Sequence, residues 1–141
     1  MGMVLYLFSV EKNVLVTSKV VPYLIQGKSS DEDAPFQKKE VVYWRKSVVI
    51  FNWFSDQLYD GKYEAETPKK VTREQLVALV NHCQNCVDSY DRKKKCADAL
   101  GQYCCEPDLA YYDSVLTIVK VNDVINCTDF ENYAIWYVPI L

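Results

Sequence analysis

The chain has 141 residues, of which half are hydrophobic and a quarter are charged, and its formal net charge is −3. These values exclude a disordered chain and predict one packed domain spanning residues 1–141. The acidic balance argues against nucleic-acid binding, because a protein that neutralises a run of phosphates needs clustered Lys and Arg. Charged residues interrupt each apolar run, so we expect no membrane span and no signal peptide.

The N-terminal third predicts two strands and a loop. Residues 3–10 and 13–21 are rich in β-branched and other apolar side chains, and Glu11-Lys12 would form the turn between them. Turn formers and charged residues then gather between Gly27 and Pro35 without periodicity. We expect an exposed loop near residues 26–40.

Residues 43–58 predict the first helix, because apolar residues recur there at helical spacing. Gly61 offers a left-handed stop just after it. A buried strand over residues 48–51 is the alternative, since a short apolar run does not distinguish the two structures by periodicity.

A second helix is predicted to begin at Thr72, which can form a capping box with Gln75, and to end near Tyr90 before a basic cluster. A third pattern runs over residues 108–125, and residues 133–138 read as a closing strand. The predicted fold class is therefore α+β, with a small sheet from the N-terminal strands and the C-terminal strand packed against about three helices.

Catalytic side chains are scarce, since His82 is the single histidine. His82 and Cys83 are neighbours on the predicted helix and point about 100° apart, which is poor geometry for a base and its nucleophile. We therefore expect no enzyme activity and no cofactor. His82 and Cys86 share a helical face, and Cys104 and Cys105 follow, so these four residues form an alternative zinc site. Free thiols are favoured, because adjacent cysteines chelate poorly.

Two clusters combine groups that bind anions. One places aromatic rings beside cationic groups on the predicted helix over residues 43–58, as a stacked base with a phosphate requires. The other gathers cations at the start of the next helix, whose free amides favour anions. Ordinary core packing and solvated surface charge are the alternatives for both. The candidate ligand-binding residues are Tyr43, Arg45, Lys46, Trp53, Lys69, Lys70 and Arg73.

Four segments resemble a family of small uncharacterised proteins encoded in bacteriophages and prophages. The resemblance rests on Met1-Gly2 through Tyr6-Leu7, on Tyr43-Trp44-Arg45-Lys46 followed by Ile50 and Trp53-Phe54, on Val71-Thr72-Arg73-Glu74-Gln75-Leu76 with Cys83, and on Thr128-Asp129-Phe130 followed by Ile135 and Tyr137. It implies a phage origin and expression in the host bacterial cytoplasm.

Small phage proteins without an enzymatic signature often act against host defences. By that analogy we expect a non-enzymatic counter-defence protein that sequesters a nucleotide-derived immune signal of the host. A direct inhibitor of a host defence protein, including a CRISPR-type effector, is the alternative, followed by a zinc-binding module or a signal-degrading hydrolase. The expected partners are a small nucleotide-like anion or a host defence protein. The aromatic content also predicts a homo-oligomer.

Overall fold

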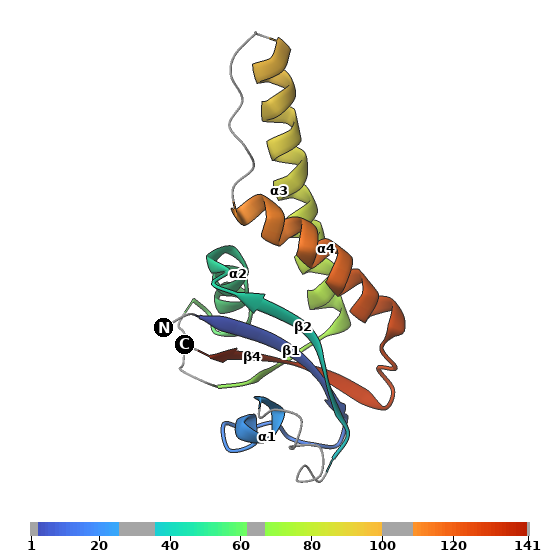
Figure 1. The fold of residues 1–141 in the computed structure, drawn as a ribbon. Helices are drawn as coiled ribbons and strands as arrows, with labels where there is room; N and C mark the ends of the chain where they lie inside the picture. The colour runs from blue at the N-terminus through green and yellow to red at the C-terminus, as the bar shows by residue number, and fades with distance from the viewer. Residues whose placement is uncertain (1–2, 26–35, 62–66, 100–108, 141) are drawn as a thin grey trace.

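The computed structural model describes residues 3–25, 36–61, 67–99 and 109–140, and it has the predicted α+β fold (Figure 1). A four-stranded sheet carries the longer helices on one face. Among the described residues, none of the helices has the length and apolar character needed to cross a membrane. In chain order the elements are β1 (Val4–Glu11), α1 (Val21–Ile25), β2 (Lys38–Arg45), α2 (Val48–Leu58), β3 (Lys69–Val71), α3 (Arg73–Ala99), α4 (Leu109–Cys127) and β4 (Tyr133–Ile140).

The sheet is antiparallel, with strand order β2-β1-β4-β3. β1 and β4 pair over their full length, from Val4 opposite Ile140 to Glu11 opposite Tyr133. This pairing confirms the predicted union of an N-terminal strand with the C-terminal strand. β2 and β3 form the two edges of the sheet, so groups at its two ends are separated by the width of the central pair.

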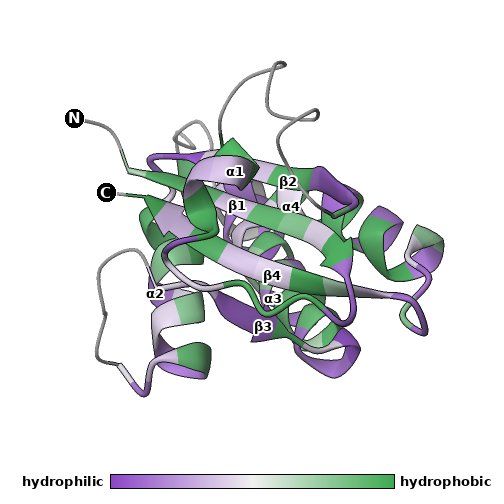
Figure 2. Ribbon diagram, turned by 90° about the horizontal axis from the view of Figure 1, so that it is seen from below, coloured by the Kyte–Doolittle hydropathy of each residue, from purple (hydrophilic) through white to green (hydrophobic). Residues whose placement is uncertain are grey.

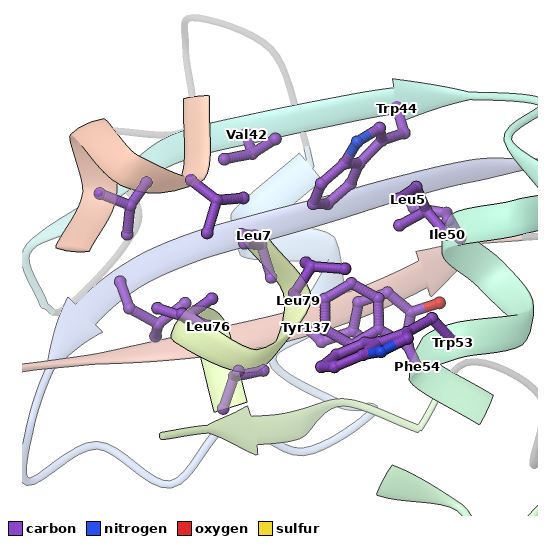
Figure 3. Close-up of a cluster of buried hydrophobic side chains, with 14 of the residues drawn as sticks. Leu5, Leu7, Val42, Trp44, Ile50, Trp53, Phe54, Leu76, Leu79 and Tyr137 are labelled. Carbon is purple, nitrogen blue, oxygen red and sulfur yellow. The ribbon is translucent and has the colours of Figure 1, made fainter. Parts of the chain in front are cut away.

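The helical face of the sheet holds the larger core. Alternation along β1 sends Leu5 and Leu7 toward α2, α3 and α4, where Trp44 and Phe54 lie in the same cluster (Figure 3). Phe8, the residue after Leu7, faces the opposite side of the sheet. There α1 and the segment before it cover part of the sheet with a smaller apolar cluster (Figure 2).

The predicted strand over residues 13–21 is wrong. β1 already pairs with β2 on one side and with β4 on the other, so no edge of β1 is open to a hairpin partner. The segment instead turns and enters α1, and its apolar residues Val16, Val21 and Leu24 bury against the smaller cluster. Burial of the same side chains is achieved without strand pairing.

The helix predicted over residues 43–58 begins only at Val48. The residues before it belong to β2, where Val42 and Trp44 are buried and Tyr43 and Arg45 are exposed at a period of two. β2 starts at Lys38, inside the loop expected near residues 26–40, of which residues 26–35 lie outside the described ranges.

Several predicted helix ends are confirmed. The Thr72 amide donates to Gln75 Oε1 at 2.9 Å, and the Gln75 amide donates to Thr72 Oγ1 at 3.1 Å, which completes the capping box. Gly61 has φ +76° and donates its amide to the Ser55 carbonyl at 2.9 Å, as a left-handed stop requires. The helix end predicted near Tyr90 is wrong, since α3 continues to Ala99 because the Lys and Arg residues there are good helix formers. Asp108, the expected start of the third helix, lies outside the described residues.

Candidate functional site

Three of the seven predicted ligand residues meet where β2 turns into α2. Arg45 ends β2, Lys46 takes the left-handed conformation with φ 56°, and α2 begins two residues later at Val48. The Lys46 amide donates to the Met3 carbonyl at 2.7 Å, which ties this turn to the start of β1. We call Tyr43, Arg45 and Lys46 the β2–α2 corner, and all three residues are exposed.

The aromatic part of this corner is held by neighbouring rings. Tyr43 lies opposite Tyr6 in the β1–β2 register, and their ring centroids are 5.4 Å apart. Tyr6 stacks in turn on Phe8, with centroids 5.2 Å apart. Cross-strand aromatic pairs restrict side-chain rotation, so the Tyr43 ring, which is 44% exposed, offers solvent a surface of fixed orientation.

The cations of the corner are available to a ligand. Within the described residues, neither Arg45 nor Lys46 forms an ion pair. Ser47, at the N-cap of α2, makes no side-chain capping bond to the first turn of that helix. Burial raises the pKa of Tyr6, and the nearby Glu40 carboxylate and Tyr43 raise it further, so its phenol stays neutral. Positive charge therefore gathers at the α2 end of the corner, away from Glu40.

The other four predicted residues lie elsewhere. Trp53 is buried in the main core with its ring 5.1 Å from that of Phe54, so it cannot contact a surface ligand (Figure 3). Lys69 and Lys70 belong to β3, at the opposite edge of the sheet, roughly 14 Å from β2 at the usual strand spacing. The Lys69 ammonium lies 5.6 Å from the centroid of the Tyr59 ring, and the Lys70 ammonium lies 5.7 Å from that of the Trp136 ring. Arg73 is the first residue of α3, which follows β3.

The residues of the alternative zinc site are placed only in part. His82 Nε2 and Cys86 Sγ lie 3.9 Å apart on the exposed side of α3, as the helical spacing predicts. Cys104 and Cys105 fall outside the described residues. Across the ranges that the structure describes, no three His, Cys, Asp or Glu side chains gather where they could hold a metal ion.

A cavity of about 500 Å³ lies between the start of β2 and the end of α4. Lys38 and Lys39 line it together with Asp123 and Asp129. Hydrogen bonds from Asn132 lower the pKa of Asp129, so this carboxylate is charged at neutral pH. Because carboxylates face the lysines across the cavity, it is a poorer anion site than the β2–α2 corner.

Sequence reasoning missed an apolar surface on α4. The residues that pack inward from this helix are Ser114, Thr117, Val121 and Val124. Four apolar residues within the segment predicted as the third helix are exposed instead. We call these four residues, which are Tyr112, Val115, Leu116 and Val119, the outer face of α4. The available signal was that apolar residues surround the helix instead of following one stripe.

Comparison of the chain with protein-family models, curated proteins and solved structures finds no match.

Proposed function

We propose that the chain is a non-enzymatic, phage-encoded counter-defence protein that binds a nucleotide-derived anion of host immune signalling at the β2–α2 corner. The observation that carries this proposal is the exposed Tyr43 ring, fixed against Tyr6, beside two cations that pair with no described carboxylate. A base stacks on the ring, the Arg45 guanidinium donates two hydrogen bonds to a phosphate, and Lys46 adds a point charge.

The biological setting of the proposal comes from the resemblance to phage proteins, and its chemistry comes from the corner. Sequestration needs only binding, so it requires neither a general base nor a metal. The uncapped first turn of α2 adds partial positive charge next to Lys46, which favours a phosphate over a neutral ligand.

Binding of cyclic mono-, di- and trinucleotides, followed by isothermal titration calorimetry and native mass spectrometry, tests this function. We expect at least one of these nucleotides to bind and to be recovered intact. Arg45→Ala with Lys46→Ala should weaken binding by more than tenfold, and Tyr43→Ala by about tenfold, because stacking on an aromatic side chain contributes about 1–3 kcal/mol per base.

Lys69→Ala with Lys70→Ala provides a matched control, since it removes the same charge from the opposite edge of the sheet. Equal loss of affinity in the control would show that only overall charge matters, and a failure of all the nucleotides to bind would overturn the proposal. Hydrolysis of a nucleotide that disappears in His82→Ala would indicate an enzyme instead.

A direct inhibitor of a host defence protein is the second candidate, because the outer face of α4 is the kind of exposed apolar surface that proteins use for docking. Leu116→Asp separates the two functions. In a host with an active defence system, this variant should keep its protective effect on an infecting phage if the corner acts, and lose it if the outer face binds the defence protein.

A further inference from the structure

The outer face of α4 is more apolar than the solvent-facing side of a helix usually is. Tyr112, Val115, Leu116 and Val119 are 56%, 38%, 41% and 62% exposed, while the opposite side of the same helix is buried in the domain. A helix that is apolar on both sides is typically covered on both sides. The inner cover is the sheet with α3, whereas none of the residues that the structure describes covers the outer side.

The four residues form one compact strip. Their spacing of three, four and seven positions places them on one side of the helix, over about 10 Å of its length. Leu109, which is 77% exposed, extends the apolar surface by about one turn toward the N-terminus of α4. The strip therefore matches in length and shape another short apolar helix face.

Two opposite charges flank the strip on one side. Asp113 and Lys120 are seven positions apart, so they project from the same side of α4, one near each end of the strip. An antiparallel helix with the same sequence would bring an aspartate toward Lys120 and a lysine toward Asp113. A parallel copy related by a two-fold axis would instead place this flank on the opposite side of the interface in the second helix, so neither charge would meet its partner.

We infer that the outer face of α4 is the interface of a homodimer, in which α4 of a second copy packs antiparallel about a two-fold axis between Val115 and Leu116. This axis places Val115 opposite Leu116 of the second copy and Tyr112 opposite Val119 of the second copy. It also places Asp113 of one copy beside Lys120 of the second copy, with an offset of about 3 Å between them along the helix axis. Each contact occurs twice, as a symmetric interface requires.

A second copy fits this surface because both its apolar strip and its charges are complementary to themselves under one rotation. A strip of this length buries less surface than the interfaces of stable dimers, which bury roughly 1,200 Å² or more. We therefore expect reversible association with a dissociation constant in the micromolar range, about 1–100 μM. The β2–α2 corner lies on other elements, so this dimer goes beyond the proposed function and does not depend on it.

Analytical ultracentrifugation of the purified full chain over a range of concentrations tests the interface. The wild type should dimerise, and Leu116→Asp should raise the dissociation constant by at least a hundredfold, because it buries an unpaired carboxylate. Asp113→Lys and Lys120→Asp should each raise it about tenfold, and the chain that carries both substitutions should recover wild-type association, because the charge pair is restored in reverse.

Lys19→Asp is the matched control, since Lys19 is an exposed lysine far from α4 in sequence and lies before α1. Circular dichroism establishes that each variant is folded. A wild type that stays monomeric at the highest concentration, including one whose outer face binds a host protein instead, overturns the dimer. A dimer that is unchanged in Leu116→Asp, or a double variant that fails to recover, overturns this interface.

Discussion

The two sides of α4 invert the usual distribution of polar and apolar residues. Its inner side buries the hydroxyl groups of Ser114 and Thr117, and its outer side exposes Tyr112, Leu116 and other apolar side chains. The buried hydroxyls are paired, since Ser114 Oγ donates to the Ala110 carbonyl at 2.8 Å and Thr117 Oγ1 donates to the Asp113 carbonyl at 2.6 Å. Small polar groups can therefore face the core when the helix backbone satisfies them.

Thr117 also links α4 to the sheet. Its Oγ1 accepts a hydrogen bond from Trp44 Nε1 at 2.9 Å, and both groups are buried. The small inner side chains let α4 approach Trp44, which a bulkier face would prevent. Residue type alone therefore does not identify the buried side of this helix, because small polar side chains fit the inner side against Trp44 while apolar side chains lie exposed on the outer side.

The largest effect that we predict for the inner side is a loss of stability at alkaline pH. Burial raises the pKa of Cys83, which lies on α3 against this side of α4, from 9.0 to about 11, while hydrogen bonds with Ser114 and Thr117 oppose the rise. The folded thiol thus binds its proton more tightly than the unfolded thiol does. This stabilisation is complete below pH 9 and disappears as the pH rises toward 11.

The expected loss by pH 11 is about 2 kcal/mol. Urea unfolding at pH 8, 9, 10 and 11 measures it, and Cys83→Ala is the control, because it removes this titration and should flatten the decline by that amount. Tyr6 titrates in both proteins and cancels in the difference. Parallel curves for the two proteins would show that Cys83 is not protected by burial.

The fold could be predicted where local signals agree with long-range packing. Thr72 and Gln75 specify a helix start through contacts three residues apart, and the closing strand contains β-branched and aromatic residues throughout. β2 was missed because Trp44 and Val48 fit a helical period as well as they fit a strand followed by a helix. The choice is made by pairing with β1, which lies about forty residues away in the sequence.

The candidate site was predictable to the extent that its members are contiguous. Tyr43, Arg45 and Lys46 stay together because only one turn separates them from α2. Trp53 was predicted to lie beside them on one helix, and Lys69 to belong to a second cluster at the start of the next helix. The helix phase instead places Trp53 in the core, and the sheet order places Lys69 at the far edge. Neither constraint is visible without the topology.

Thr117→Val tests the contribution of the buried hydroxyl on the inner side of α4, and its expected effect on stability is smaller. Valine keeps the shape of threonine but removes the acceptor for Trp44 Nε1, which then stays buried without a partner. We expect the free energy of unfolding to fall by about 1–2 kcal/mol. Chemical denaturation measures this change. In a Trp44→Phe background, which lacks the donor, the same substitution should cost clearly less, and an equal cost in both backgrounds would show that the hydrogen bond does not contribute.

The smallest effect is expected on the outer side. Val119 is 62% exposed and Val121 is fully buried, although only one residue separates them on the helix. Val119→Ala should change the free energy of unfolding by less than about 0.5 kcal/mol in the monomer, because its methyl groups contact mainly water. Val121→Ala should cost about 2 kcal/mol, through lost burial and the cavity that remains.

Measuring Val119→Ala and Val121→Ala at several protein concentrations tests whether the outer side contributes to association. In dilute solution, where the chain is monomeric, the two substitutions should differ as stated. At concentrations above the dissociation constant, Val119→Ala should become destabilising, since the dimer stabilises only the folded chain and the substitution weakens the dimer. The cost of Val121→Ala should not change with concentration. If Val119→Ala were neutral at every concentration, the outer side would contribute nothing to association.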